Sequence, residues 1–352
     1  MQSFVYTAQP ARVIFGAGSL SRLAQEIEVL GARKALVLST PEQREAAENV
    51  AALLGPRAAA VFDRAVMHVP IEVAREAREL ARQLGADCAV AIGGGSTTGL
   101  GKAIALDSGL PIVAIPTTYA GSEMTPIYGI TEAGLKKTGR DMRVLPRTVI
   151  YDPELSLTLP APLSVTSGIN AIAHAAEGLY AVDRNPIMDL MAEEGIAALG
   201  RALPRIVKNT VDPEARSHAL YGAWLCGTVL GHVGMALHHK LCHTLGGTFN
   251  LPHAETHTIV LPHALAYNSQ FAPQAMARIQ RALGGRQAAQ AVYDLARDNG
   301  APVALKTLGL SQADLDKACE IALQNQYPNP RPLERSALRQ LLQNAWEGIR
   351  PE

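Results

Sequence analysis

The sequence predicts an α/β domain with a Rossmann-like parallel sheet at residues 1–155, followed by an all-helical domain at residues 156–352. Short apolar runs alternate with helical patterns in the first part, which is typical of a parallel sheet covered by helices. After Asp152 and Pro153, helical patterns follow one another without a convincing strand. A chain of 352 residues is also too long for one ordinary core, so two domains are expected.

The elements of the first domain follow from where the apolar runs begin and end. Ser19 is expected to cap a helix that Gly31 stops, because a hydroxyl accepts from the first N–H groups and glycine tolerates the left-handed conformation at a helix end. The other helices are expected at Gln43–Leu54, Pro70–Leu84 and Leu100–Asp107, and the strands at Phe4–Tyr6, Arg12–Phe15, Ala35–Leu38, Ala58–Phe62, Cys88–Ile92 and Ile112–Ile115.

The second domain is expected to be a bundle of long apolar helices after a linker marked by Pro160 and Pro162. The active site is expected in the cleft between the two domains, where ligand pockets commonly form. The predicted helices are Val165–Val182, Ile187–Leu203, Ala215–Gly234, Ala236–Leu245, Ile259–Asn268, Gln287–Asn299, Gln312–Leu323 and Glu334–Gly348.

The composition is that of a globular protein, with 48% hydrophobic and 18% charged residues. Basic and acidic residues number 32 each, so neither a nucleic acid nor an acidic membrane surface is predicted as a partner. The four cysteines are widely spaced and form no CxxC pair, which argues against a disulfide framework and favours a cytoplasmic setting. The N-terminus lacks the features of a signal peptide, and no apolar run reaches transmembrane length.

A glycine-rich loop follows a buried strand and opens the next helix. Its glycines would let the backbone approach a phosphate, which the amides and the positive end of the helix then bind. The spacing is not the G-x-G-x-x-G fingerprint and the alternative is a plain turn, but the place between strand and helix favours phosphate binding. Lys102, one turn into the helix, is expected either to reach the same phosphates or to lie in solvent. The loop consists of Gly93, Gly94, Gly95 and Ser96.

Hydroxyl side chains follow two other expected strands. Thr117, Thr118 and Tyr119 stand at the carboxyl end of one strand, where hydroxyls can bond a ribose or a diphosphate. Ser39 and Thr40 follow an earlier strand, at the place where the ribose of an adenosine would lie. No acidic residue stands directly beside them to repel a 2′-phosphate, so NADH and NADPH are both open as cofactors.

Six of the ten histidines fall between residues 237 and 263. His239 and His243 are four residues apart, so both imidazoles project from the same face of an expected helix. The glycine pair 246–247 is expected to stop that helix, and His253 follows a proline that suits the start of the next one. A single histidine is more often a hydrogen-bonded core residue, but this density predicts a metal or substrate pocket.

A second polar pair lies upstream of the histidine stretch. Asn170 and His174 are one turn apart on another apolar helix, which repeats the spacing of His239 and His243. Buried polar groups need partners, so we expect these four side chains to line one pocket rather than four separate ones.

Together these motifs resemble the iron-containing alcohol dehydrogenase superfamily, whose fold is similar to that of dehydroquinate synthase. The resemblance covers nearly the whole chain and rests on the GGGS loop, the IPTT…GSE strand end, the DPEL linker and the two histidine segments ending in LPH. It implies that the glycine loop binds the diphosphate of a nicotinamide cofactor, with Thr117 and Thr118 beside it. His243 corresponds to a further histidine near the nicotinamide and the substrate. The positions that match the metal cage of the family are Asn170, His174, His239 and His253.

Two departures from the family pattern matter. The carboxylate of the cage is replaced by Asn170, and the acidic residue a few places after the glycine loop is replaced by Gly99. Because amides are poor ligands for iron or zinc, we expect no stoichiometric metal. Both departures resemble a branch of the family that reduces a carbon–carbon double bond with NADH or NADPH. The implied substrate is a small unsaturated keto-dicarboxylate.

The resemblance to this branch implies a division of roles. His243 is expected to be the proton donor or the partner of an enolate. The three histidines of the cage positions are expected to donate hydrogen bonds from the pocket wall and to be protonated near neutral pH. Asn170 and Tyr119 are expected to line the substrate pocket, and no residue is assigned to a metal.

Three other interpretations stay open. A metal-dependent NAD(P) alcohol dehydrogenase of the same fold would tolerate Asn170 as a ligand, and a cyclase similar to dehydroquinate synthase would use the cofactor transiently. A ligand-binding protein would use the cleft without chemistry. We also expect a homodimer, because the pair of N-terminal strands offers an edge for pairing.

Overall fold

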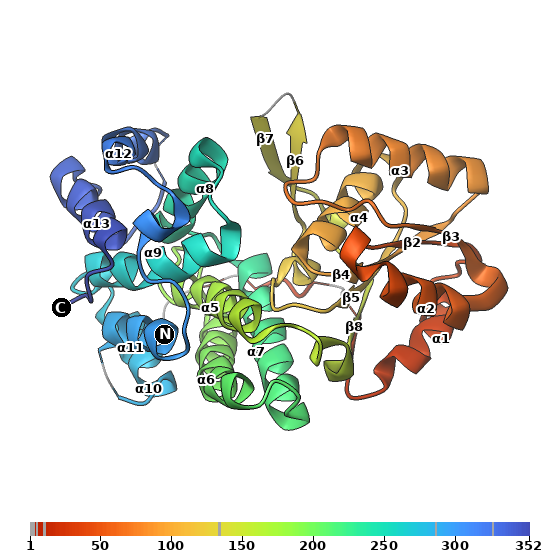
Figure 1. Cartoon of the computed structure of the whole chain (residues 1–352), viewed down its shortest axis with the longest axis horizontal. Helices are drawn as coiled ribbons and strands as arrows, with labels where there is room; N and C mark the ends of the chain where they lie inside the picture. Colours follow the sequence, from red (N-terminus) through yellow and green to blue (C-terminus); the bar gives the residue numbers. More distant parts are fainter. Residues whose placement is uncertain (1–3, 5, 10–11, 133–134, 286, 326) are drawn as a thin grey trace. The chain divides into compact units, whose positions relative to one another are not determined.

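The computed structural model describes residues 4, 6–9, 12–132, 135–285, 287–325 and 327–352. These residues form two compact units. Residues 8–158 make up the α/β unit, and residues 159–352 group with the described residues up to Thr7 as the helical unit. Figure 1 colours the α/β unit from red to yellow and the helical unit from green to blue.

The α/β unit is built on a six-stranded parallel sheet with the strand order β1–β8–β5–β4–β2–β3. From β2 the chain runs to β3 at one edge and then to β4 on the other side of β2. The carboxyl ends of β2 and β4 therefore form a topological switch point, where ligands bind in sheets of this kind. The strands are β1 Arg12–Phe15, β2 Ala35–Leu38, β3 Ala58–Phe62, β4 Cys88–Gly93, β5 Ile112–Pro116 and β8 Thr148–Tyr151.

Helices cover both faces of this sheet because the side chains of each strand alternate between the faces. Val37 packs in one apolar cluster with residues of α1 and α2. Leu36 and Leu38, its neighbours along β2, pack in a second cluster with residues of α3 and α4. The helices are α1 Leu23–Val29, α2 Arg44–Leu54, α3 Ile71–Leu84 and α4 Gly95–Ser108 (Figure 1).

The helix expected to be capped by Ser19 begins differently. A short 3₁₀ helix comes first and α1 starts only at Leu23, although Gly31 follows the helix in the left-handed conformation (φ 71°) as predicted. The Ser19 hydroxyl donates to the carbonyl of Tyr151 at 3.3 Å instead of capping. The Asp152 carboxylate accepts from two N–H groups of this turn at 3.1 and 3.0 Å. The capping acceptor therefore comes from the end of a strand far along the chain.

The strand expected at Phe4–Tyr6 was also wrong for the residues that can be judged. Phe4 and Tyr6 lie outside any strand, and Val5 lies outside the described residues. The Tyr6 ring instead stacks on His232, with centroids 5.8 Å apart. The homodimer was expected because of this strand, so it stays a prediction without that support.

Three further strands were not predicted. β6 (Ile127–Glu132) and β7 (Leu135–Arg140) form a separate antiparallel pair, and β8 completes the parallel sheet between β1 and β5. The LKKTGR sequence of β7 is too polar for its pattern to indicate a strand, and β8 has only four residues.

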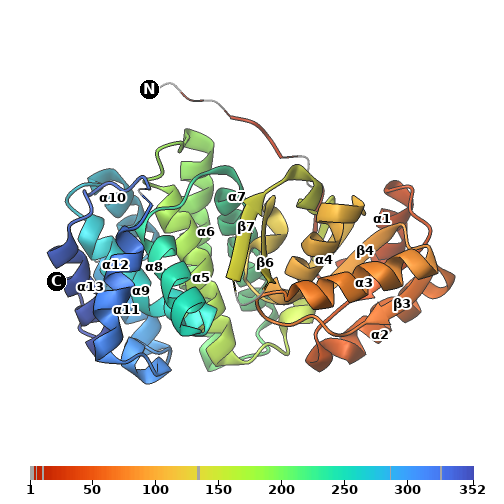
Figure 2. The ribbon, with the colours of Figure 1, turned by 90° about the horizontal axis from the view of Figure 1, so that it is seen from above.

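The helical unit confirms the predicted bundle with shifted ends. α8 continues through the glycine pair 246–247 to Phe249 and ends at Asn250, whose φ is 53°. Packing of Leu245 and Phe249 in the core outweighs the cost of about 1 kcal/mol for each helical glycine. α10 was not predicted. The helices are α5 Ala161–Gly178, α6 Pro186–Lys208, α7 Pro213–His232, α8 Leu237–Phe249, α9 His253–Asn268, α10 Pro273–Ala282, α11 Ala288–Asp298, α12 Leu315–Leu323 and α13 Arg335–Glu347 (Figure 2).

α5 is buried on all sides, in contact with α6, α7 and α9. Its glycines allow this close packing: a Cβ at Gly168 would lie 2.7 Å from a methyl carbon of Leu203, and one at Gly178 would collide with Val229. Asn170 and His174 are therefore held in the interior of the unit. In the described part of the chain, no single helix is long and apolar enough to span a membrane; α7 and α8 pass that test only as a pair bent by 95°.

Candidate active site

The carboxyl ends of β2, β4 and β5 bring together the residues predicted to bind a cofactor. β4 pairs with β2 on one side and with β5 on the other, so Gly93 lies beside Pro116. The backbone N–H of Thr117 donates to the Gly93 carbonyl at 3.0 Å. Ser39, Gly93 and Thr117 thus follow three adjacent strands at the switch point of the sheet.

The first two positions of the glycine loop leave no room for a side chain. Gly93 has a φ of 149°, and a Cβ there would lie 2.5 Å from Oγ1 of Thr97. A Cβ at Gly94 would lie 3.0 Å from Cγ2 of Thr118. The loop and the threonines after β5 therefore form one compact surface, on which only backbone atoms of the first two loop residues are presented.

The N-terminus of α4 gives this surface free N–H groups and a partial positive charge. α4 begins at Gly95, with Ser96 in its first turn, and its N-cap residue Gly94 has no capping side-chain bond. The first N–H groups of a helix lack intrahelical acceptors and carry the positive end of the helix dipole, which together suit a phosphate.

Gln43 also belongs to this surface, although nothing in the sequence around it predicted a binding residue. Its Nε2 donates to Oγ1 of Thr117 at 2.8 Å. The 3₁₀ turn Pro41–Gln43 that positions it follows Ser39, which is buried, and Thr40, which is half-buried. A glutamine in a polar helix start is ordinary, so only the fold reveals this contact.

Lys102 differs from both expectations, because its side chain is buried rather than in solvent and its ammonium group is bound to the segment after β5 rather than directed to the glycine loop. It is buried, and its Nζ donates to the carbonyls of Ser122 (2.6 Å) and Ile127 (2.7 Å) and to Oγ1 of Thr125 (2.9 Å). Burial lowers the pKa of Lys102 to about 7, against the opposing effect of the Glu123 carboxylate. Three acceptors match the three hydrogens of an ammonium group, so Lys102 braces the segment that follows β5.

Gly99 faces a strained turn. A Cβ at Gly99 would lie 2.8 Å from Cγ2 of Val69. Val69 and His68 both have left-handed backbones, with φ 46° and 67°, which is an outlier conformation for a β-branched residue. Thr131 holds this turn, because its N–H donates to the Val69 carbonyl at 3.0 Å and its hydroxyl donates to the His68 carbonyl at 2.7 Å. Val69 thus fills the space where an acidic side chain at position 99 would begin.

In the helical unit, α5, α8 and α9 bring three histidine rings together. The ring centroids of His174 and His239 are 5.2 Å apart, those of His239 and His257 5.1 Å, and those of His174 and His257 6.3 Å. His257 was not among the predicted site residues. It lies four residues after His253, on the same side of α9, with its ring 4.3 Å from that of His253.

His243 and His253 lie on the exposed side of this cluster, whereas His174, His239 and His257 are buried. The ring of His243 is 6.2 Å from that of His239. The cluster therefore extends from a buried group of imidazoles to a solvent-accessible rim. Tyr119, also predicted for the substrate pocket, is completely buried in the α/β unit.

Burial keeps the imidazoles of His174 and His257 neutral. Burial first, and then the neighbouring histidines, lower the pKa values of His174 and His257 well below the usual range. The expectation that His174 is protonated near neutral pH was therefore wrong. Four buried atoms of neighbouring side chains have no hydrogen-bond partner among the described residues. Each unsatisfied buried group costs about 1–3 kcal/mol of folding free energy. The four atoms are Oδ1 of Asn170, Nδ1 of His174, Nε2 of His239 and Nε2 of His257.

Glu177 is the carboxylate that contacts the cluster. It lies on α5, is completely buried, and accepts a hydrogen bond from Nδ1 of His239 at 2.7 Å. Burial alone would raise the pKa of Glu177, but the hydrogen bond from His239 and the other donors around it lower the pKa to about 2. The group is therefore an anion at neutral pH.

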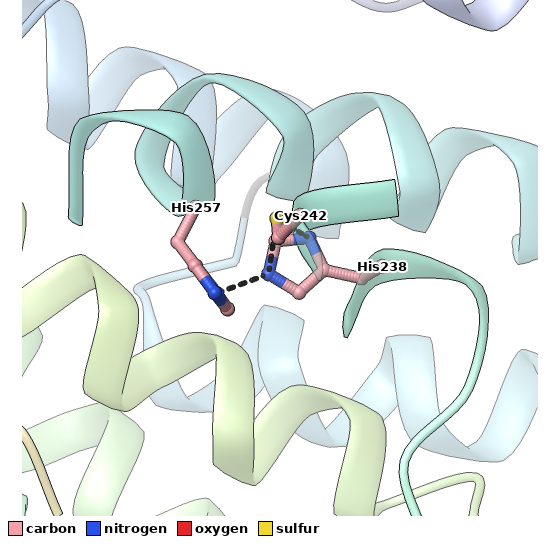
Figure 3. Close-up of side chains that lie close together, drawn as sticks. All are labelled: His238, Cys242 and His257. Atoms are coloured by element: carbon pink, nitrogen blue, oxygen red, sulfur yellow. Dashed lines mark hydrogen bonds between the residues drawn. The ribbon is translucent and has the colours of Figure 1, made fainter. Parts of the chain in front are cut away.

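The positions inherited from the family's metal cage do not fit a metal. Asn170 offers a weakly binding amide. Within the described ranges, only one set of three metal-binding side chains brings its ligand atoms within 4.8 Å of one another, and it does not include His174, His239 or His253. That set is His238, Cys242 and His257 (Figure 3).

Hydrogen bonding accounts for this second set. Nε2 of His238 and Nδ1 of His257 are hydrogen-bonded at 2.9 Å, and Sγ of Cys242 lies 3.7 Å from the same His238 nitrogen (Figure 3). Burial raises the pKa of the Cys242 thiol well above its ordinary value, which favours the thiol over the metal-binding thiolate. We therefore interpret the set as a support for His257.

Comparison with known proteins identifies the family. Residues 10–153 match the family model described as iron-containing alcohol dehydrogenase, and residues 164–346 match the C-terminal model of the same family. The maleylacetate reductase of Burkholderia cepacia is 65% identical over 351 residues, which cover 100% of both chains.

Solved structures agree with this result. The crystal structure of maleylacetate reductase from Agrobacterium tumefaciens matches with a TM-score of 0.97 and 56% identity. That from Rhizobium sp. strain MTP-10005 matches with a TM-score of 0.96 and 57% identity. Both matches cover 100% of each chain. The chain therefore belongs to the iron-containing alcohol dehydrogenase family, and within it to the maleylacetate reductases.

Proposed function

We propose that this chain reduces the carbon–carbon double bond of 2-maleylacetate with NADH or NADPH and forms 3-oxoadipate, a step in the degradation of aromatic compounds. The relatives named maleylacetate reductase support the substrate. The observation that carries the proposal is the buried cluster of imidazoles with an amide, Asn170, at the position where the family pattern has a carboxylate. Because an amide is a weak ligand for a divalent ion, this arrangement favours an organic substrate over a metal.

The chemistry of a conjugated alkene makes a metal less necessary. Reducing a ketone to an alcohol develops charge directly on oxygen, where a Lewis acid helps most. In maleylacetate the hydride of the reduced nicotinamide can add to the alkene carbon that is β to the ketone. The electron pair of the double bond then forms an enolate, and a general acid protonates the α-carbon. Hydrogen bonds suffice to stabilise the enolate.

We assign the proton transfer to His243, because it lies on the exposed side of the cluster and can recover a proton from solvent. His174, His239 and His253 would form the pocket wall. Asn170 would contact the substrate, whereas the expected contact of Tyr119 is dropped because that side chain is completely buried in the α/β unit. The cofactor diphosphate would lie on the glycine loop, Gly93 to Ser96, beside Thr117 and Thr118, with the adenosine ribose near Ser39 and Thr40. The proposed partners are thus the keto-dicarboxylate and a nicotinamide cofactor.

The test follows NADH absorbance with maleylacetate, with and without a chelator. We expect oxidation of NADH that the chelator leaves unchanged, and less than one iron or zinc per subunit by metal analysis, because none of the four cage positions carries an anionic side chain. Activity on simple alcohols that disappears with the chelator would instead establish the metal-dependent alcohol dehydrogenase. Failure to consume NADH with any unsaturated keto-diacid would contradict the proposal and favour a ligand-binding protein.

The role of His243 is tested by replacing it with alanine. We expect turnover to fall by about 10²- to 10⁴-fold, the usual contribution of a positioned general acid, with the dissociation constant for NADH nearly unchanged. His218→Ala removes another exposed histidine, on α7, and serves as the control. Turnover of His243→Ala equal to that of the control would refute the assignment.

A further inference from the structure

We infer that Glu177 is a positioning residue, which holds the His239 ring in one tautomer and fixes the start of α8 so that Nε2 of His239 is the atom presented to the ligand. The inference rests on the proposed function, since it assigns a support to the same pocket. Glu177 itself is completely buried and contacts no solvent, so it acts through His239.

One oxygen of the Glu177 carboxylate accepts three hydrogen bonds. Oε2 of Glu177 accepts from Nδ1 of His239 at 2.7 Å and from the backbone N–H of the same residue at 3.2 Å. It also accepts from the N–H of Ala236 at 2.8 Å. One oxygen is therefore hydrogen-bonded to both the ring and the main chain of His239.

The second oxygen is used in the same region. Oε1 accepts from the N–H of His238 at 2.9 Å and from the hydroxyl of Tyr180 at 3.2 Å. A carboxylate has about four lone-pair sites, and these five donors use all of them. Glu177 is consequently oriented from several sides, and it has no remaining acceptor site for a substrate.

These contacts replace a helix cap. α7 and α8 are bent by 95° at the break between them, and the N-cap residue of α8 is Ala236, which has no polar side chain. The first N–H groups of a helix need acceptors from elsewhere. Glu177 supplies them from α5, and its negative charge lies at the positive end of the α8 dipole.

The tautomer of His239 follows from the chemistry of the pair. A carboxylate only accepts hydrogen bonds, so Nδ1 of His239 carries the hydrogen. In the neutral ring, Nε2 then bears a lone pair and accepts a hydrogen bond from a ligand or an ordered water. This differs from the donor role expected for His239 from the sequence. Loss of the carboxylate would allow the other tautomer, in which Nε2 is a donor.

The test compares Glu177→Gln and Glu177→Asp with the wild-type protein. In Glu177→Gln one acceptor oxygen becomes an NH2 group, which can only donate, and we expect kcat to fall on the order of 10- to 100-fold, as when the partner of a functional histidine is lost. KM for NADH should change little, because none of the hydrogen-bond partners of Glu177 belongs to the proposed cofactor surface. Glu177→Asp keeps the charge and should recover part of kcat.

Nitrogen-15 NMR of histidine-labelled protein reads the tautomer directly. The His239 signals, assigned with His239→Gln, should show hydrogen on Nδ1 in the wild-type protein and a mixture of tautomers in Glu177→Gln. If Glu177→Gln does not fold, Glu177→Asp provides the test. The side chain of aspartate is one methylene shorter, so its carboxylate lies farther from Nδ1 and should also allow the second tautomer to be populated. Unchanged signals in the folded variants would overturn the inference.

A matched control separates positioning from general loosening of the bend. The Asp183 carboxylate accepts from the N–H of Gly234 at 2.9 Å, in the same α7–α8 break, and within the described residues it accepts no hydrogen bond from a histidine. Asp183→Asn should keep the tautomer signals and nearly all of kcat. An equal loss of kcat in both variants, with unchanged tautomers, would show a purely structural role. The NMR result needs no substrate, so it stands even if maleylacetate is not reduced.

Discussion

At Gly99, a Cβ would lie 2.8 Å from Cγ2 of Val69, whose own backbone is held at a φ of 46°. Two unusual features therefore meet in one place: a β-branched residue in the left-handed region and a glycine inside a helix. The hydrogen bonds from Thr131 maintain the turn at His68 and Val69. The glycine at position 99 is thus coupled to the packing of a neighbouring segment.

Gly99→Ala tests this coupling. We expect the free energy of unfolding to fall by about 1–3 kcal/mol, because an added methyl group must displace Val69 in a packed site. The double variant Gly99→Ala with Val69→Ala should recover most of that loss. Urea unfolding measures both. Gly247→Ala is the control, since a Cβ there meets nothing within 4 Å, and it should be neutral or slightly stabilising. The idea fails if the single and double variants are equally stable.

Among the elements, α9 carries three histidines within a largely buried helix. His263 is 4% exposed, and burial lowers its pKa to about 4. In the unfolded chain the pKa of a histidine is about 6.5. Between these values the unfolded state binds more protons than the folded state, so the stability is complete above about pH 6.5 and falls as the pH drops toward 4.

His263→Leu removes this contribution. Compared with the wild-type protein, the variant should lose less stability on acidification from about pH 7 to pH 4, by about 3 kcal/mol. Urea unfolding at several pH values gives the difference. The buried His174, His238 and His257 shift in the same direction, so some acid sensitivity will remain. The exposed His218, changed to leucine, provides the reference, and a pH dependence equal to wild type in His263→Leu would rule out the assignment.

Short sequence patterns predicted the ends of helices correctly where the residues that determine each end are close to it in the sequence. α9 begins at His253 directly after Pro252, as the proline indicated, although the apolar pattern had placed the start of the helix only at Ile259. The cap at Ser19 was wrong because Asp152, at the end of β8, supplies the acceptor. The stop at glycines 246–247 was wrong because core packing carries α8 onward to Phe249. Both failures come from partners distant in the sequence.

At the scale of the whole molecule, the family match spans both units, at residues 10–153 and 164–346. Alternation of strands and helices predicted the parallel sheet, and uninterrupted helical patterns predicted the bundle. The glycine loop and the threonines after β5 could be placed together because the carboxyl ends of parallel strands share one edge. Their assignment to a cofactor stays a proposal.

The sequence by itself determined the fold class, the family and the residue types of the candidate site, including the amide of Asn170. Only the tertiary structure decided the protonation, the tautomers and the hydrogen-bond partners of these residues. Burial makes His174 neutral, and Glu177, 62 positions before His239, sets which nitrogen of that ring carries hydrogen. Lys102 likewise became a structural brace. Protonation and tautomer depend on solvent exclusion and on partners from other elements, and periodicity or motif spacing contains neither.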